Sequence, residues 1–462
     1  MTPYSPHPPI SLKMRVLKAG SWTLIGFGLA LFLRLVCNII IARLLDPQVF
    51  GIMAVCTAIH VIIALISDIG LRQAVIRSEN ANDPAFLNTA WTVQILRGII
   101  IWITCIGAAI VLHLLNARDF LPAGTVYRNA ALPPLIIAAS FSTVIQGLQS
   151  MNGVVLGREL DLKRNTIIEI ANVVVGYIVA IAVAWHTRSV WAFIFSSWTA
   201  SVLGVTLSHL WLPGIKARLA WNKTALRELA SFGRWASASS FIGVIAINGD
   251  RLLLGGWLSP TSLGFYSIAS NLASVLDNIG SRVFGSVSLP ALGEIVRKQP
   301  DRLGEIFFRM RRWADVCYVG SAGLLFAIGQ TLIALLYDAR YFDAGHMLQL
   351  LSFGLLFKRY GLVQDAYIAL GKPQYLAALN ATKVVSLFVA VPVLFYIMGI
   401  EGAILGMAFY LLPTIPVIFW LNRRYGLNNF RFEILMLAVW PAGWLVGTTF
   451  VACLQSIHSV AH

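Results

Sequence analysis

Ionisable side chains that lie inside long apolar segments are the residues of this chain best suited to chemistry. Charges within a membrane-spanning segment are costly, and they usually face a cavity or one another. Arg34 lies about two helical turns from either end of its apolar segment, too deep to reach a surface by extending its side chain. Buried bases of this kind suit a water-filled cavity that contacts an anionic substrate. We predict a cationic lining made of Arg34, Arg97, Arg251, Lys358, Arg359 and Lys383.

Structural roles for the same bases stay open. Arg34 could pair with Asp68 or with another buried acid, and Asp250 could form a local ion pair with Arg251. Lys383 lies only about one and a half helical turns into its segment, so its side chain could reach the cytoplasmic surface. Arg97 resembles Lys383 in this respect.

Buried acids form a second set, and they are candidates for carrying a proton if a cation gradient drives the chain. Nothing in the sequence selects among these acids, which are Glu169, Asp250 and Asp365. The eight His and five Cys show no metal-ligand spacing, and there is no Walker A motif. We therefore expect no metal, no cofactor and no catalytic residue.

The elements that would position these charges are membrane-spanning helices. Of the 462 residues, 58% are hydrophobic and only 12% are charged, whereas a soluble protein carries about twice that charged fraction. The apolar runs are about 20 residues long, enough to cross a bilayer as a helix. We predict an all-α integral membrane protein with about thirteen spans, at roughly 19–42, 49–71, 87–113, 131–153, 167–186, 190–212, 229–256, 262–290, 315–337, 346–371, 376–398, 402–421 and 433–455.

Lys and Arg are concentrated in alternate connections between these spans. The positive-inside rule then places the N-terminus in the cytoplasm. The net charge of +15 reflects this orientation, with anionic lipids as partners of the basic loops. It argues against a nucleic-acid partner. Residues 293–313 alternate charged and apolar positions, and they predict either an amphipathic helix on the cytoplasmic face or a solvated loop.

One stretch of the chain occurs twice. ARLLDPQVFGIMAV at 42–55 matches GGWLSPTSLGFYSI at 255–268, with Pro47 and Gly51 aligned to Pro260 and Gly264. An even number of spans separates the copies, so the two repeats are parallel, related by an axis along the membrane normal. The predicted parts are a tail (1–18), an N-lobe of six spans (19–212), a basic cytoplasmic linker (213–228), a C-lobe of six spans (229–421) and a basic loop with one extra span outside the core (422–462).

The repeated residues have a structural interpretation. A proline at a helix start and a glycine for close helix packing explain Pro47, Gly51, Pro260 and Gly264. Further along each copy, an acid or amide, a glycine and an arginine recur near the cytoplasmic end. They predict a clamp of hydrogen bonds and ion pairs at the helix end, formed by Asp68, Gly70 and Arg72 in the first copy and by Asp277, Gly280 and Arg282 in the second.

These stretches resemble polysaccharide-export flippases. The resemblance is carried by 42–55 with the DIGLRQAVIR run at 68–77, and by GDRLLLGGWLSPTSLGFYSIA at 249–269. The family is the Wzx-type flippases of the multidrug/oligosaccharidyl-lipid/polysaccharide (MOP) superfamily, in the colanic-acid and exopolysaccharide exporter branch. Members often have 12 or 14 spans, so a thirteenth span is a departure.

The resemblance implies a function. Such a flippase moves undecaprenyl-pyrophosphate-linked oligosaccharide repeat units across the bacterial inner membrane for exopolysaccharide or O-antigen synthesis. It works by alternating access through a V-shaped cationic cavity, beside polysaccharide polymerase and chain-length proteins.

Three other functions remain as alternatives. A MATE-like drug exporter of the same fold would have its cavity lined by Glu169, Asp250 and Asp365, with the bases outside it. A membrane ligase or polymerase would need catalytic groups on a large outer loop, but the longest one, 114–130, offers only Asp119 and nearby His113. A scaffold in a synthesis complex would need no buried charges. We therefore expect a transporter rather than an enzyme.

Overall fold

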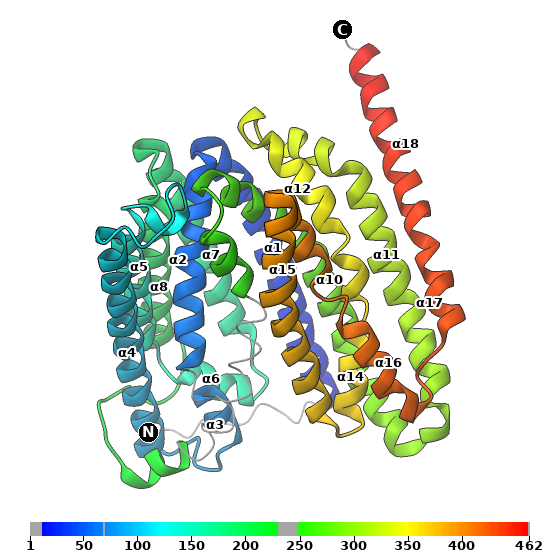
Figure 1. The fold of residues 1–462 in the computed structure, drawn as a ribbon. Coiled ribbons are helices and arrows are strands. Elements are labelled where there is room, and N and C mark those ends of the chain that lie inside the picture. The colour runs from blue at the N-terminus through cyan, green and yellow to red at the C-terminus, as the bar shows by residue number, and fades with distance from the viewer. Residues whose placement is uncertain (1–11, 68–69, 230–247, 461–462) are drawn as a thin grey trace. The chain divides into compact units, whose positions relative to one another are not determined.

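All regular secondary structure in the part of the chain that the structure describes is helical (Figure 1). This computed structural model describes residues 12–67, 70–229 and 248–460. Within these ranges eight helices are long and apolar enough to cross a membrane, or nine if one bent helix pair is counted as a single span. The prediction of an all-α, multi-pass membrane protein is confirmed. The number of thirteen spans stays a prediction, because most of the expected span at 229–256 lies outside the described residues.

The chain folds into two compact units. Among the described residues, unit 1 comprises 12–45, 56–67, 70–121 and 128–229, and unit 2 comprises 46–55, 122–127 and 248–460. Two short pieces from the first half of the chain therefore belong to unit 2. As a result, α2 (Pro47–Ile66) and η1 (Val126–Arg128) each lie partly in both units.

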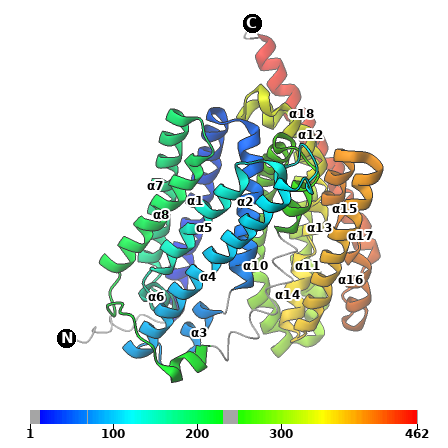
Figure 2. The same ribbon diagram turned by 60° about the vertical axis from the view of Figure 1, so that its left-hand side comes forward.

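Unit 1 is a bundle in which α4 packs on α5, α7 packs on α8, and α1 packs on α7 (Figure 2). Its longest helix, α4, begins at Pro84, and the Asp83 carboxylate accepts hydrogen bonds from the Ala85 and Phe86 amides at 3.2 Å. Proline at the first helical position and aspartate before it are favoured helix-start residues. The helices of unit 1 are α1 (Leu12–Leu44), α3 (Leu71–Arg77), α4 (Pro84–Ala117), α5 (Leu132–Gly147), α6 (Asn152–Arg158), α7 (Lys163–Thr187) and α8 (Trp191–Leu210).

The segment expected as a basic linker, 213–228, packs against unit 1. Its backbone amides at Arg218 and Asn222 donate to the side chains of Asn88 and Thr89 on α4 at 3.0 and 3.1 Å. Ala225 is buried in an apolar cluster with residues of α3 and α4. This segment is therefore bound to the bundle along its length.

Unit 2 is built around two long helices, α10 (Pro260–Lys298) and α11 (Leu303–Leu336), joined by the short η2 (Pro300–Arg302). Residues 293–313, expected as a separate surface helix or a loop, are the adjoining ends of these two helices. The reason is that Leu292, Leu303 and Phe307 are buried and continue the apolar faces of α10 and α11. The remaining helices of unit 2 are η3 (Ala339–Tyr341), α12 (Phe342–Ser352), α13 (Leu355–Lys358), α14 (Gly361–Ala369), α15 (Pro373–Phe409), α16 (Thr414–Asn422), η4 (Arg423–Tyr425), α17 (Phe430–Leu437) and α18 (Val439–Val460).

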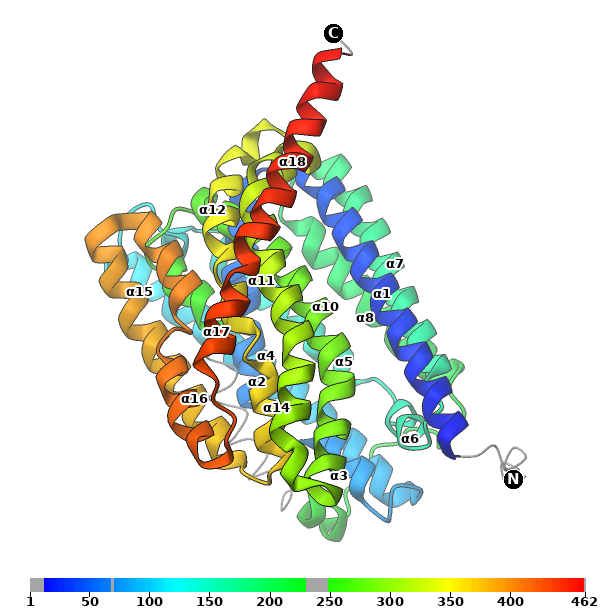
Figure 3. The same ribbon diagram turned by 90° about the vertical axis from the view of Figure 1, so that its right-hand side faces the viewer.

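The C-terminal helix α18 lies along α11 (Figure 3). Gly323 of α11 and Gly443 of α18 permit this close packing, because a Cβ on Gly323 would meet the Trp440 carbonyl and one on Gly443 would meet the Gly320 carbonyl. Glycines of this kind let helix backbones approach closely in membranes.

Unit 2 has a break inside one expected span and another at the boundary between two expected spans. The expected span at 346–371 consists of α12, α13 and α14, separated by turns. The expected spans at 376–398 and 402–421 meet at Gly399, where a φ of 64° and ψ of −139° interrupt α15. Glycine is the residue that adopts such a conformation without strain. The break in the first of these spans determines where its charged residues lie.

Candidate functional site

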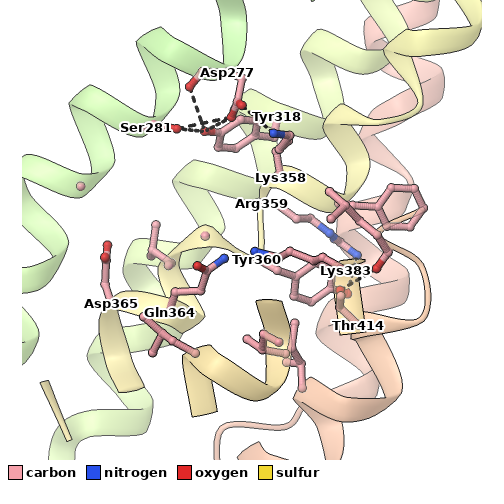
Figure 4. Close-up of a pocket in the computed structure, with 18 of the residues that line it drawn as sticks. Asp277, Ser281, Tyr318, Lys358, Arg359, Tyr360, Gln364, Asp365, Lys383 and Thr414 are labelled. Atoms are coloured by element: carbon pink, nitrogen blue, oxygen red, sulfur yellow. Dashed lines mark hydrogen bonds and ion pairs between the residues drawn. The ribbon is translucent and has the colours of Figure 1, made fainter. Parts of the chain in front are cut away.

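A cavity of about 500 Å³ lies inside unit 2, between α10, α11, α13, α14, α15 and α16 (Figure 4). Polar side chains from several of these helices face it, together with two lysines and two aspartates. α10 is less apolar than α11 and is not one of the described helices apolar enough to cross a membrane, because it carries polar and charged residues such as those that face this cavity. The residues used below are Asp277, Ser281, Tyr318, Lys358, Gln364, Asp365, Asn380, Lys383, Tyr410 and Thr414.

Lys358 reaches the cavity from the last position of α13. Its Nζ lies 2.8 Å from Asp277 Oδ2, and the two side chains are 39% and 21% exposed. The Tyr318 hydroxyl and the Ser281 hydroxyl both donate to Asp277 Oδ1, at 3.4 and 3.3 Å. Asp277 was expected to clamp the helix end near Arg282. The structure pairs it with Lys358 instead.

Lys383 enters the same cavity from α15. Its Nζ donates to Asn380 Oδ1 at 3.3 Å, and no carboxylate within the described ranges lies in ion-pair distance of it. Lys383 therefore supplies positive charge that no described acid neutralises, whereas the charge of Lys358 is balanced by Asp277.

Asp365 lies on α14, away from Asp277 in the cavity wall (Figure 4). The Ser288 hydroxyl of α10 donates a short hydrogen bond to its Oδ2. Gln364 lies next to it and offers a neutral amide to the same space. The cavity thus presents two ammonium groups, two carboxylates and several neutral hydrogen-bonding groups.

Arg359 differs from its neighbour. Its side chain is 4% exposed and points away from Lys358 (Figure 4). Its guanidinium pairs with Asp315 Oδ2 at 3.3 Å and with Glu433 Oε2 at 2.9 Å. Although part of Arg359 borders the cavity, these two carboxylates take up its charge. Arg311 completes this buried cluster, which sequence reasoning did not find, because nothing in the local pattern links 311 with 433.

The predicted bases of unit 1 lie elsewhere. Arg34 has an exposed side chain on α1 beside Tyr177 of α7. Arg97 on α4 donates to the Ala64 carbonyl at 2.9 Å and to the Ser67 hydroxyl at 3.5 Å, at the C-terminal end of α2. Neither base lines the cavities of about 390 and 210 Å³ in the described part of unit 1.

Glu169 on α7 lines a separate cavity of about 390 Å³ in unit 1 together with Arg72. The polar groups around them already hold the break between α5 and α6. Gln94 donates to the Gly147 and Gln149 carbonyls, both at 2.9 Å. Because Glu169 lies on α7 in unit 1 and Asp365 lies on α14 in unit 2, these two predicted acids belong to different units.

Asp250 and Arg251 lie in the helical residues 248–255 of unit 2. The Tyr266 hydroxyl of α10 donates to Asp250 Oδ2 at 2.7 Å. Neither residue is among those that line the cavity of Lys358. A tyrosine on the next helix, not Arg251, is the hydrogen-bond partner shown for Asp250.

The repeated Pro-x-x-x-Gly segments contact each other within unit 2. A Cβ on Gly51 would collide with the Pro260 carbonyl oxygen, and one on Gly264 would collide with the Pro47 carbonyl oxygen. The first turn of α2 and the first turn of α10 therefore cross in a reciprocal contact that only glycine permits. The Ser259 hydroxyl caps α10 by accepting from the Ser262 amide at 3.1 Å.

The second part of the repeat is described only in part. Gly70 precedes α3 with a φ of 61°, in the left-handed region that favours glycine. Gly280 lies against Tyr318, whose hydroxyl oxygen would be 2.6 Å from an added Cβ. Arg282 is exposed on α10. Asp68 lies outside the described residues.

The helical fold and the charged cavity inside it define a multi-pass membrane protein with a transporter fold. Two solved structures share it, each with a TM-score of 0.64. A multidrug resistance MATE family transporter of the MOP superfamily, in an inward-facing conformation, is 13% identical, with 92% of this chain and 96% of that chain covered. The lipid II flippase MurJ, in an inward closed conformation, is 12% identical, with 94% and 98% covered. At such low identity the likeness concerns the fold alone.

The chain belongs to the polysaccharide biosynthesis protein family, whose sequence pattern matches residues 40–346. It is 22% identical over 347 residues to the lipopolysaccharide biosynthesis protein WzxC of Escherichia coli (strain K12), with 74% of this chain and 67% of that protein covered. It is 21% identical over 408 residues to a membrane protein in the cps region of Klebsiella pneumoniae, with 86% and 80% covered. The predicted resemblance and the prediction of a transporter rather than an enzyme are confirmed.

Proposed function

We propose that this protein is a flippase that moves undecaprenyl-pyrophosphate-linked oligosaccharide repeat units from the inner to the outer leaflet of the bacterial inner membrane. Its N-terminus lies in the cytoplasm, and its product feeds exopolysaccharide or O-antigen assembly by polymerase and chain-length proteins. The observation that supports this most is the cavity of unit 2, where Lys358 and Lys383 face one volume inside a transporter fold. Membership of a polysaccharide biosynthesis family supports the lipid-linked sugar as substrate.

The cavity has the groups that a diphosphate needs. Ammonium groups bind phosphate oxygens as point charges with three donors each. Lys383 has no described acid partner, so it can offer its full charge to an entering anion. The hydroxyls of Tyr410 and Thr414 and the amides of Gln364 and Asn380 lie around the same space and can hydrogen-bond to phosphate or sugar oxygens.

Transport follows by alternating access. The headgroup enters a cavity that is open to the inside, while the lipid tail stays in the bilayer. The two lobes, 19–212 and 229–421, then rock and open the cavity outward. A cation gradient supplies the energy. Of the three acids predicted for ion coupling, Asp365 shares the cavity with the two lysines, so an ion bound there would act on the same charged volume.

A drug exporter of the same fold is less well supported. Its cavity would be lined by Glu169, Asp250 and Asp365 with the bases outside it. In unit 2 only Asp365 of these three lines the cavity, and Lys358 and Lys383 line it as well. A cationic drug would therefore meet two ammonium groups at close range.

Complementation of a gene deletion in the source bacterium tests the proposal. We expect deletion to abolish polymer and to leave lipid-linked repeat units on the cytoplasmic side. Lys358→Gln and Lys383→Gln should fail to restore polymer although they insert normally, because each removes a cavity charge. Lys298→Gln is the matched control, since Lys298 is exposed at the end of α10 in a pair with Glu294. Unchanged polymer after deletion of this gene and its paralogues would contradict the flippase function.

A further inference from the structure

We infer that Glu433, in α17, is a positioning residue for the anion-binding cavity and that it acts on Lys358 through Arg359. The inference rests on the proposed function, because it treats Lys358 as a group that binds the anion. Sequence reasoning placed 422–462 outside the core as an appendage. The contacts of Glu433 connect this segment to the cavity wall.

Glu433 is one of four buried charges that balance one another. Its Oε1 lies 2.7 Å from Arg311 Nη2, and its Oε2 lies 2.9 Å from Arg359 Nη2. Asp315 contacts the same two arginines, at 3.5 Å from Arg311 Nε and 3.3 Å from Arg359 Nη1. The four side chains are between 0% and 10% exposed. The Tyr360 hydroxyl donates to Glu433 Oε2 at 3.0 Å.

This cluster holds the chain at the point where the expected span at 346–371 is broken. Arg359 and Tyr360 form the turn between α13 and α14, and Lys358 is the residue before them. The helix α13 has only four residues, too few to hold its own orientation through helical hydrogen bonds. The side chains of Arg359 and Tyr360 therefore anchor this turn on one side, and Lys358 projects into the cavity on the other (Figure 4).

Loss of the Glu433 charge should change the position of the Lys358 ammonium. It would leave two buried guanidinium groups with a single carboxylate, Asp315. An unpaired buried charge is strongly unfavourable, so one arginine must move toward water or toward another partner. Arg359 is the nearer to an open volume, because it borders the cavity. Since Arg359 and Lys358 are consecutive, a movement of Arg359 displaces the Lys358 ammonium from Asp277.

A purely structural role for Glu433 makes a different prediction. It would hold α17 and α18 on α11, and its loss would lower stability without a specific effect on Lys358. Gly443 offers a matched control for this role. An alanine there collides with the Gly320 carbonyl, so it loosens the contact between α18 and α11 and leaves the four charges unchanged.

A double-mutant cycle separates the two roles. The ligand is inorganic pyrophosphate, titrated into the purified full-length protein in detergent, and the variants are Glu433→Gln, Lys358→Gln and the double variant. Glutamine at 433 can still accept from Tyr360 but carries no charge. We expect Glu433→Gln to weaken pyrophosphate binding about tenfold, and to have no further effect when Lys358 is already replaced, because groups in one network are not additive. Gly443→Ala should lower the unfolding temperature and leave pyrophosphate affinity unchanged.

Each outcome decides between the two ideas. Equal effects of Glu433→Gln in the presence and absence of Lys358 would overturn the positioning role while the proposed function stands. Failure of the wild-type protein to bind pyrophosphate, or binding that Lys358→Gln does not weaken, would overturn both.

If Glu433→Gln does not fold, Arg311→Gln/Glu433→Gln replaces it. This variant keeps the buried charges balanced and leaves Arg359 paired with Asp315. We expect it to fold and to bind pyrophosphate nearly as the wild type does. A loss of affinity as large as that of Lys358→Gln, in this charge-balanced variant, would contradict positioning through the charge of Arg359.

Discussion

Gly264→Ala should destabilise the protein although alanine is the better helix former. The added Cβ would collide with the Pro47 carbonyl oxygen and lie 2.7 Å from its carbonyl carbon. These are backbone atoms, so no flexible side chain can move aside. Overpacking of this kind costs about 1–3 kcal/mol, and the lower backbone entropy of alanine in the unfolded chain offsets about 0.5–1 kcal/mol of it. The two terms together allow a net loss of about 0–2.5 kcal/mol, and we expect about 1–2 kcal/mol because the contact involves backbone atoms.

The assay is thermal unfolding of the purified protein in one detergent. Gly293→Ala is the matched control, because Gly293 lies on the same helix and nothing is within 4 Å of its added Cβ. It should raise stability by about 0.5–1 kcal/mol. Gly51→Ala should act like Gly264→Ala, and the double variant should lose less than the sum, since both residues serve one crossing. An unfolding temperature for Gly264→Ala at or above that of Gly293→Ala would refute the close contact between the two repeated segments.

Two further predictions concern ion pairs. Asp277→Asn should tighten pyrophosphate binding about fivefold, because a partly exposed pair with Lys358 is worth about 1 kcal/mol; unchanged or weaker binding in a titration would show that Asp277 does not compete with the anion. Arg340 lies 2.8 Å from Asp46 and 2.6 Å from Asp338, but all three side chains are at least one-third exposed. Arg340→Gln should therefore lower the free energy of unfolding by less than about 1 kcal/mol. A larger loss in chemical unfolding would contradict this.

The membrane-spanning helices could be predicted because length and hydropathy determine them locally. The expected spans at 167–186 and 190–212 correspond to α7 at Lys163–Thr187 and α8 at Trp191–Leu210. The span expected at 87–113 is longer in the structure because Asp83 and Pro84 start α4 earlier. Such start signals are readable in the sequence, as is the break at Gly399, which lies at the predicted boundary between two spans.

The cavity could be predicted only in part, because its charges find partners that are distant in sequence. Lys358 and Arg359 are adjacent, and helical geometry correctly implies that they point in different directions. It does not show that one meets Asp277 and the other Glu433. The break at 359–360 is not marked by a proline, and the charged residues next to it do not by themselves predict a turn. The roles of these two bases therefore depend on tertiary contacts that a single sequence does not contain.

The pairing of Lys358 with Asp277 also bears on how a flippase could release its substrate. A transporter must bind strongly enough to load and weakly enough to unload. Two unpaired ammonium groups in a low-dielectric cavity would hold a diphosphate tightly, because electrostatic attraction grows as water is excluded. Asp277 competes with the diphosphate for Lys358. When the anion leaves, the ion pair between Lys358 and Asp277 forms again and offsets part of the lost attraction. On the proposed function, Asp277→Asn should therefore bind pyrophosphate more tightly and yet support less polymer synthesis in cells, a combination that a purely structural Asp277 would not produce.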